Sequence, residues 1–398
     1  MTYRGRLALA LGGATYFAAW AFGSMMLYPV ALGLLAAALL AWLWTRAANR
    51  PLELRRSLPA GDRIDGDDVE VRLQLVSERR LLPARWVVRE RVGKLGERET
   101  PFGLDGKARY VLSSLSRGRY VFEDSRAVVE DPFGLERIEQ PLPAAGAVLV
   151  YPRLVDLERL FSESGARAMD GRRLLLRRPS GFDLHSVREY EQGESLRKVH
   201  WRSTARRGQL MVKELEDSPR DEVAVVLDAD PAAVVGDSFE VQVRAAGSIL
   251  KAHAHRGRRA VLVVNSGHGA KQRVHSSDGD WRQALDLLAA VEPEPGPPLA
   301  ALLGDEAGAP ARALELAVVT AALPQPLVER LLIRSLGHGS VAVVFVDTAT
   351  FGATGSRSRP LPELLRLQAG GIAVAVLRRG DRLAERLGAR EVGKAAHG

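Results

Sequence analysis

Arginine and lysine side chains gather in one stretch of the sequence. Between Arg167 and Lys213 there are twelve Lys or Arg residues and five Asp or Glu residues. Most of the formal net charge of +8 therefore lies here. Guanidinium groups hold phosphate or carboxylate through paired hydrogen bonds, so such a cluster can bind an anion. The arginines that would form such an anion clamp are Arg188, Arg197, Arg202 and Arg206.

Three interpretations of this basic stretch stay open. A helix capped by Ser195 and ended by Gly208 places Lys198, Arg202 and Arg206 four residues apart, on one face. That face can bind an anionic ligand, or it can lie against anionic lipid. In the third interpretation, ion pairs hold two domains together. The pairs would join Arg188, Arg197 and Arg206 to Glu189, Glu194 and Glu214.

Few other residues form a catalytic pattern. His253 and His255 are two apart on a predicted helix, so they point to different faces and cannot chelate together. His200 stands beside Trp201, where packing competes with a general-base role. The sequence has no Gly-x-x-x-x-Gly-Lys-Ser/Thr motif for nucleotide hydrolysis. With no cysteine, it has no thiol nucleophile and no thiolate metal site. We expect a noncatalytic protein.

The elements that must position these residues follow from composition and periodicity. The chain has 398 residues, 46% hydrophobic and 26% charged, which is typical of two or three globular domains. Residues 52–151 show short alternating runs and turn residues, which predict an all-β, sandwich-like domain. Residues 152–220 are the basic segment.

Residues 221–398 alternate strands with helices, which predicts a Rossmann-type parallel α/β sheet covered on both faces. The strands are expected at 223–227, 260–264, 316–319, 341–346 and 372–377. The helices are expected at about 238–255, 281–290, 326–336 and 360–368, with a loop from 292 to about 312. Any ligand should lie at the carboxyl ends of the strands.

The N-terminal region is expected to cross a membrane. No charged residue occurs from Leu7 to Thr45. That length fits a helical hairpin within residues 1–51, with spans at about 7–22 and 25–45. Arginines flank both ends of the apolar run, so both termini and the soluble domains are expected on the cytoplasmic side of the inner membrane. A cleaved signal peptide is the alternative, but it leaves the second apolar run unexplained.

The stretch from Gly181 to Arg207 resembles the signature of the domain-of-unknown-function 58 family. Glu194 stands for the customary Asp and Val199 for the customary Ile. The residues that match the signature are Arg188, Tyr190, Gly193, Arg197, Trp201, Arg202, Thr204, Ala205 and Arg206, and Lys213 fits the strand that follows. The resemblance extends to a membrane helix pair and to a β-rich segment containing Asp131-Pro132-Phe133-Gly134-Leu135. It also implies a von Willebrand factor A-like domain.

The resemblance implies a function as well. Members of this family resemble partners of MoxR-type AAA+ ATPases and are often encoded beside transglutaminase-like membrane proteins. It therefore implies a membrane-anchored adaptor or assembly factor for cell-envelope processes. The alternative is a sensor or enzyme that binds an anionic envelope precursor or a lipid headgroup through the signature arginines. Nucleic acid is not expected as a partner, because the basic stretch is mixed with acids and tied to a membrane.

The resemblance also points to a metal site. Domains of the von Willebrand A type hold Mg²⁺ through Asp-x-Ser-x-Ser after the first strand, because hard cations prefer oxygen ligands. Here Asp228 and Asp230 match, Ala232 offers no ligand, and Thr320 ends a later strand with Ala321 where an Asp is expected. The alternative is that Asp228 and Asp230 cap the next helix or loop. We expect no cofactor, with Mg²⁺ as the one candidate.

Overall fold

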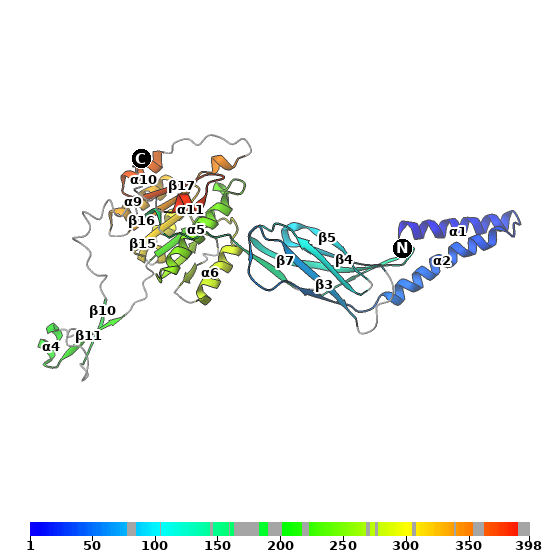
Figure 1. Ribbon diagram of the computed structural model, residues 1–398, viewed down its shortest axis with the longest axis horizontal. Helices are drawn as coiled ribbons and strands as arrows, with labels where there is room; N and C mark the ends of the chain where they lie inside the picture. Colours follow the sequence, from blue (N-terminus) through cyan, green and yellow to red (C-terminus); the bar gives the residue numbers. More distant parts are fainter. Residues whose placement is uncertain are drawn as a thin grey trace, which may run out of the picture. The chain divides into compact units, whose positions relative to one another are not determined.

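The computed structural model describes most of the chain in two compact units, Met1–Arg153 and Leu154–Gly398 (Figure 1). The division lies close to the predicted boundary after residue 151. The helix pair belongs to the first unit, and the signature segment belongs to the second. The described residues are 1–77, 85–103, 105–143, 146–158, 160–162, 183–189, 201–216, 223–267, 271–274, 278–304, 308–337, 340–352 and 362–388.

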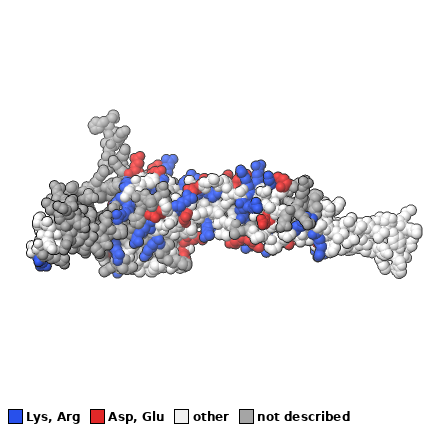
Figure 2. Space-filling model, turned by 90° about the horizontal axis from the view of Figure 1, so that it is seen from below, with Lys and Arg blue, Asp and Glu red and all other residues white. Residues whose placement is uncertain are grey.

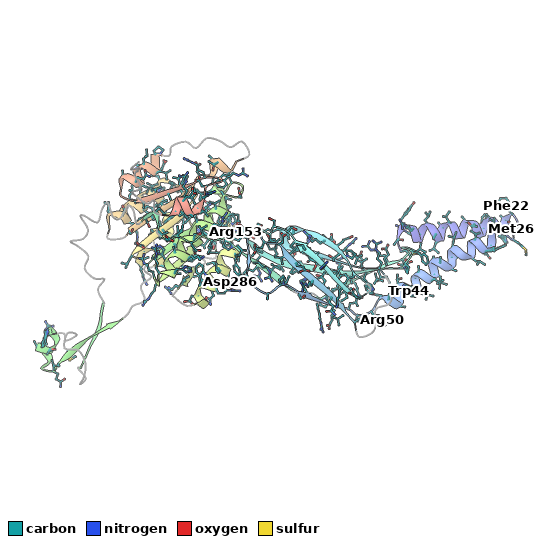
Figure 3. The ribbon with its side chains drawn as sticks, in the orientation of Figure 1. Phe22, Met26, Trp44, Arg50, Arg153 and Asp286 are labelled. Carbon is teal, nitrogen blue, oxygen red and sulfur yellow. The ribbon has the colours of Figure 1, made fainter. Side chains whose placement is uncertain are left out.

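The first unit begins with two helices that pack against each other, α1 (Tyr3–Ala21) and α2 (Leu27–Ala48). Phe22 and Met26 lie at the connecting turn, and Trp44 and Arg50 lie at the opposite end (Figure 3). The buried residues of the two helices are small and recur every seven positions, which is two helical turns. They include Gly5, Gly12 and Ala19 on α1 and Ala31, Ala38 and Thr45 on α2.

Large apolar side chains cover the outside of the helix pair. Phe17, Trp20 and Leu40 are 65%, 69% and 63% exposed. The surface of the pair away from the sheets is white in Figure 2, free of charged groups. A soluble helix buries its large apolar side chains, so this pair has the reverse arrangement.

One of the described helices is long and apolar enough to cross a membrane by length and composition, and it is α2. Only 17% of its most apolar stretch is buried. The expectation of two spans is thus supported for the second span alone. Helix α1 does not reach the same apolarity, because it begins with Arg4 and Arg6 and contains three glycines.

Two sheets follow and enclose one core, as expected of a sandwich, and their strands pair antiparallel except for β2, which pairs parallel with β9. Strands alternate buried and exposed residues, and Leu73, Trp86, Leu112 and Phe122 meet between the sheets. The first sheet has the order β1-β3-β6, from β1 (Glu53–Ser57), β3 (Val69–Val76) and β6 (Lys107–Leu112). The second has the order β2-β9-β7-β4-β5, with β8 paired to β7. Its strands are β2 (Arg63–Ile64), β4 (Arg85–Val92), β5 (Glu97–Pro101), β7 (Gly118–Glu130), β8 (Arg137–Pro141) and β9 (Ala147–Tyr151).

An ion pair is buried inside this sandwich. Arg56 Nη2 lies 2.6 Å from Glu90 Oε2, and the two side chains are 6% and 0% exposed. The Tyr110 hydroxyl donates to Glu90 Oε1 at 2.7 Å, and the Arg56 guanidinium lies 3.7 Å from the centroid of the Phe122 ring. Burial raises the pKa of Tyr110, and its hydrogen bond to Glu90 raises it further. The pair therefore joins β1, β4 and β6 across the core.

The second unit contains a six-stranded sheet of order β14-β13-β12-β15-β16-β17. All strands are parallel except the edge strand β14, which pairs antiparallel with β13. Alternate residues of β12 face two separate cores, with Val225 in one and Val226 in the other, so both faces are covered. The strands are β12 (Val223–Leu227), β13 (Ala260–Val264), β14 (Lys271–Val274), β15 (Glu315–Thr320), β16 (Ser340–Val346) and β17 (Ala373–Leu377).

The helices of this unit connect the strands and cover the sheet. Helix α5 packs on the core that contains Val225, whereas α9 and α10 pack on the core that contains Val226. The helices are α5 (Ser238–His255), α6 (Asp278–Ala290), α7 (Leu299–Gly304), α8 (Ala309–Arg312), α9 (Gln325–Leu336), α10 (Pro362–Ala369) and α11 (Leu383–Leu387). The region predicted as a loop from 292 to 312 contains α7 and α8, so that prediction was wrong there. The prediction of a fully parallel sheet was wrong at the edge strand β14, which is antiparallel. Its four residues are too few and too polar to show the two-residue period of a strand.

Candidate functional site

Polar side chains stand in a row at the carboxyl ends of four neighbouring strands. Asn265 follows β13, Asp228 follows β12, Thr320 ends β15 and Asp347 follows β16. This edge is where ligands bind in open α/β sheets. All four side chains are buried, with exposed fractions between 0% and 6%. The row is the candidate functional site that the sheet topology indicates.

The Asp228 carboxylate is bound by its neighbours on both oxygens. Thr320 Oγ1 donates to Oδ2 at 2.6 Å, and Asn265 Nδ2 donates to Oδ1 at 2.7 Å. The Asn265 amide oxygen in turn accepts the backbone N–H of Ala229. Burial raises the pKa of Asp228, and the hydrogen bonds from Thr320, Asp230 and Asn265 oppose that rise. These bonds join the ends of three strands.

These residues do not fit a Mg²⁺ site. Both oxygens of Asp228 already accept hydrogen bonds, and Ala232 has no oxygen in its side chain. Asp230 is exposed, and its Oδ1 accepts the N–H of Ala232 at 3.0 Å, which caps a short 3-10 turn, Pro231–Ala233. Among the described residues, no group of three or more His, Cys, Asp or Glu could hold a metal ion. Asp230 therefore has the capping role that was the alternative to metal binding.

Sequence reasoning missed Asn265 and Asp347. Arg378 Nε lies 3.6 Å from Asp347 Oδ2, an atom that is buried and has no hydrogen bond among the described residues. Each missed residue comes directly after a buried strand, as Asp228 does. Applying the rule of carboxyl strand ends to every predicted strand would have found both.

The signature segment is described in part. Strand β10 (Asp183–Glu189) pairs antiparallel with β11 (Met211–Glu216), which places Arg188 opposite Val212 and Lys213 opposite Val187. Tyr190, Gly193, Glu194 and Arg197 lie outside the described residues, and so does His200.

Between the strands lies helix α4 (Trp201–Arg207), which contains Arg202. It ends at Gly208, as predicted, where φ is +72°. Thr204 Oγ1 accepts the N–H of Met211 at 3.0 Å, which fixes the path from helix to strand. Trp201 is 66% exposed and Arg206 is exposed too.

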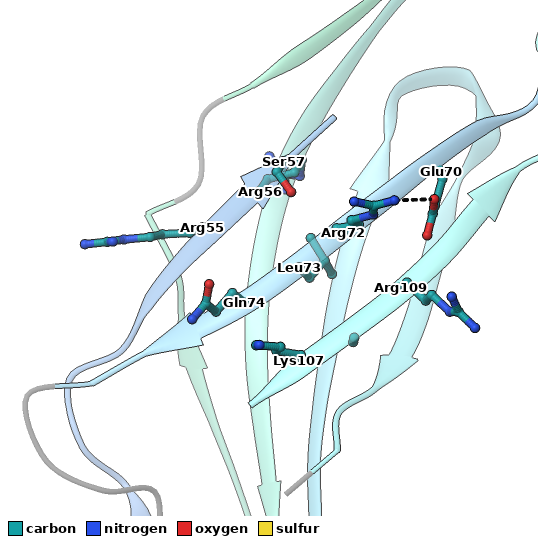
Figure 4. Close-up of a pocket in the computed structure, with 10 residues that line it drawn as sticks. Arg55, Arg56, Ser57, Glu70, Arg72, Leu73, Gln74, Lys107 and Arg109 are labelled. Carbon is teal, nitrogen blue, oxygen red and sulfur yellow. Dashed lines mark hydrogen bonds and ion pairs between the residues drawn. The ribbon is translucent and has the colours of Figure 1, made fainter. Parts of the chain in front are cut away.

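A hollow of about 650 Å³ lies on the outer face of the sheet β1-β3-β6 (Figure 4). Its residues are far apart in the sequence, so the hollow could not be predicted from spacing or motifs. The register places Arg72 directly opposite Arg109, and Gln74 opposite Lys107. Like charges in directly opposite positions destabilise a sheet, so a bound anion would be favourable here. Glu70 offsets part of the charge, because it lies 3.0 Å from Arg72, which lowers the pKa of Glu70.

His253 is a buried histidine at the end of α5. It is 3% exposed, whereas His255 is exposed, so the two point to different faces as expected. Burial lowers the pKa of His253 to about 3, with further lowering by the charges of Arg258 and Arg256. Arg258 Nη1 lies 3.3 Å from His253 Nδ1 and 2.6 Å from Glu315 Oε2. His253 is therefore neutral at pH 7 and part of the core.

We expect this histidine to make stability depend on pH. The folded-state pKa lies below the ordinary value of 6.5, so the unfolded chain binds the proton more tightly. Stability is full above pH 6.5 and falls as the pH decreases toward 3. At pH 5 the loss is about 2 kcal/mol. The free energy of unfolding is measured by urea unfolding of the full-length protein in detergent at pH 7.5 and at pH 5. Between these two pH values, the wild type should lose about 2 kcal/mol more than the His253→Gln variant. Equal losses in both proteins would contradict it.

Comparisons with known proteins agree with part of the resemblance. Residues 186–353 match the model of a family described as "Protein of unknown function DUF58". The uncharacterized protein YeaD of Bacillus subtilis (strain 168) is 25% identical over 273 residues. The match covers 68% of this chain and 66% of that protein, just under two thirds of its length.

Solved structures give only distant similarities. A conjugative transposon lipoprotein from Bacteroides eggerthii matches over 24% of this chain and 98% of its own, at 19% identity and a TM-score of 0.15. A β-glucuronidase from Parabacteroides merdae matches over 73% of this chain and 33% of its own, at 7% identity and a TM-score of 0.19. With scores this low, neither similarity supports an argument about fold or function.

Proposed function

We propose that this protein is a membrane-anchored, noncatalytic adaptor that docks a MoxR-type AAA+ ATPase in cell-envelope processes. The observation on which the anchor rests is the helix pair, with small residues inside and large apolar residues outside. In lipid, small residues let helix backbones approach closely, and large apolar side chains face the acyl chains. Helix α2 has 22 residues, or about 33 Å, enough to span the hydrocarbon core.

In this proposal both helices cross the membrane as a hairpin. Arg4 and Arg6 at the start of α1 and Arg46 at the end of α2 flank the same end of the pair. Basic residues favour the cytoplasmic side, so the soluble units and both termini lie in the cytoplasm. The chain then contacts membrane lipid, and transglutaminase-like membrane proteins are proposed as further partners.

In this proposal the α/β sheet serves as a docking platform for the ATPase. We propose that it is von Willebrand factor A-like, supported by its strand order and by its antiparallel edge strand β14. The hydrogen bonds that occupy Asp228 support a structural role for the strand ends, so we propose that no cofactor is needed. The rationale for the ATPase partner is the resemblance of the signature segment.

The exposed end of helix α4 is the proposed contact for the ATPase, because Trp and Arg dominate the binding energy of many protein interfaces. Full-length protein in detergent should retain the cognate MoxR-type ATPase and change its ATP turnover. Replacing Trp201 by Ala should weaken retention about 30-fold or more. Leu336→Ala is the matched control, because Leu336 is 86% exposed on α9. The adaptor proposal fails if the wild-type protein neither retains the ATPase nor alters its turnover.

Anion sensing is a second candidate function, favoured by the opposed arginines in the hollow. It differs from the first expectation, which assigned anion binding to the signature arginines. Calorimetry with inorganic phosphate separates the two anion sites. The variant Arg72→Gln/Arg109→Gln removes the arginines of the hollow, and Arg197→Gln/Arg206→Gln removes two signature arginines. The control is Arg126→Gln/Arg137→Gln, which removes one exposed and one half-buried arginine of the other sheet. Binding lost only in the first variant would assign the anion to the hollow, and absence of wild-type binding would reject this function.

A further inference from the structure

The turn between β7 and β8 holds a large apolar side chain out of the core. Phe133, within the Asp131-Pro132-Phe133-Gly134-Leu135 motif, is 76% exposed. Asp131 is 2% exposed and fixes the turn with both carboxylate oxygens. Its Oδ1 accepts the N–H of Phe133 at 2.8 Å, and its Oδ2 accepts the N–H of Glu136 at 2.6 Å. Gly134 completes the turn with φ at +67°. The exposure of Phe133 is therefore built into a rigid turn.

The same turn packs against the first residues of helix α1. Thr2 Oγ1 donates to the carbonyl oxygens of Gly134 at 2.7 Å and Leu135 at 2.9 Å. The Thr2 backbone N–H donates to the Leu135 carbonyl at 3.1 Å. Gly5 lies so close that a Cβ there would collide with that carbonyl. Phe133 thus lies next to the end of α1 that carries Arg4, Arg6 and the exposed Tyr3.

We propose that Phe133 is a membrane-insertion site, which enters the boundary between headgroups and acyl chains of the bilayer that holds the helices. This inference rests on the proposed function, because it requires that α1 and α2 span that bilayer. The end of a span lies at the membrane surface, where aromatic side chains are favoured. Arg4 and Arg6 beside the turn can meet lipid phosphates. The occupant of this apolar position is therefore lipid.

The absence of cysteine from the chain makes a direct test possible. Single-cysteine variants of the full-length protein, Phe133→Cys, Leu40→Cys and Lys107→Cys, are labelled with an environment-sensitive fluorophore. They are then placed in lipid nanodiscs without any other protein. Leu40 is 63% exposed on α2 and reports whether the helix lies in lipid, whereas Lys107 is exposed on the sheet surface and serves as the aqueous reference. Quenching is measured with lipids brominated near the headgroup or deep in the chain, and with acrylamide, a neutral quencher dissolved in the aqueous phase.

We expect the label at position 133 to be quenched by shallow bromines, and by acrylamide about threefold less than the label at position 107. The label at position 40 should respond to deep bromines. If position 40 responds to deep bromines and acrylamide quenches position 133 as strongly as position 107, the insertion site is wrong and the anchor stands. If position 40 shows no lipid quenching, the membrane anchor and the insertion site both fail.

Discussion

Replacing Glu90 by Leu lowers the free energy of unfolding of the first unit by about 3–5 kcal/mol, because it leaves a guanidinium buried without a counter-charge. The Arg56 side chain is 6% exposed, so little water can reach the guanidinium in place of the lost carboxylate. The loss should be visible as an earlier urea transition of the full-length protein in detergent.

The double variant Arg56→Met/Glu90→Leu tests the cause of that loss. It removes both charges and keeps the volume apolar, so it should recover most of the stability lost in the single variant. The control is Arg137→Met, which breaks an ion pair at the surface. Its partner Glu139 is 39% exposed, so the loss of this pair should lower the free energy of unfolding by less than about 1 kcal/mol. The explanation is wrong if the double variant is no more stable than the Glu90→Leu protein.

The second large effect is expected at Asp228. Replacing it by Ala leaves the buried Asn265 amide without its acceptor and makes the Thr320 hydroxyl turn to the Ala322 carbonyl, which should cost about 1–3 kcal/mol of stability. Asn in place of Asp228 keeps an oxygen for Asn265 and offers an N–H to Thr320, whose hydrogen can turn to the Ala322 carbonyl. Asp228→Asn should therefore stay within about 1 kcal/mol of wild type.

A structural Asp228 and a metal-binding Asp228 respond differently to Mg²⁺. A ligand present at 100 times its Kd stabilises a protein by about 2.7 kcal/mol. We expect millimolar Mg²⁺ to leave the unfolding midpoints of wild type and of Asp228→Asn unchanged. A midpoint raised by Mg²⁺ in the wild type but not in Asp228→Asn would assign a metal to this carboxylate after all.

Buried, strongly periodic segments of the fold could be predicted from the sequence. The segments 223–227, 238–255 and 260–264 match β12, α5 and β13 residue for residue, because an apolar run or a 3.6-residue period is a local signal. Strand β14 gave no such signal, since an edge strand of four residues buries little. The short helices α7 and α8 follow a proline-rich run, which favours the prediction of a loop.

The candidate site could be predicted only in part, because its geometry depends on distant residues. Asp228 and Thr320 were singled out through the resemblance to a von Willebrand A-type motif, but their hydrogen bond depends on β12 and β15 being neighbours in the sheet. Arg72 and Arg109 could not be paired from the sequence, since their opposition follows from the strand register. The buried partner of Arg56 was missed for the same reason.

The proposed function requires that a membrane hairpin anchors the protein with both soluble units in the cytoplasm. It can be tested with single cysteines in the otherwise cysteine-free chain. Met25, 86% exposed at the turn between the helices, reports one side, and Lys107 and Arg366, exposed on the two units, report the other. A membrane-impermeant maleimide applied to intact spheroplasts should label Met25→Cys, and should label Lys107→Cys and Arg366→Cys only after lysis. Labelling of position 107 or 366 in intact spheroplasts, or a position 25 that stays unlabelled, would contradict the claim.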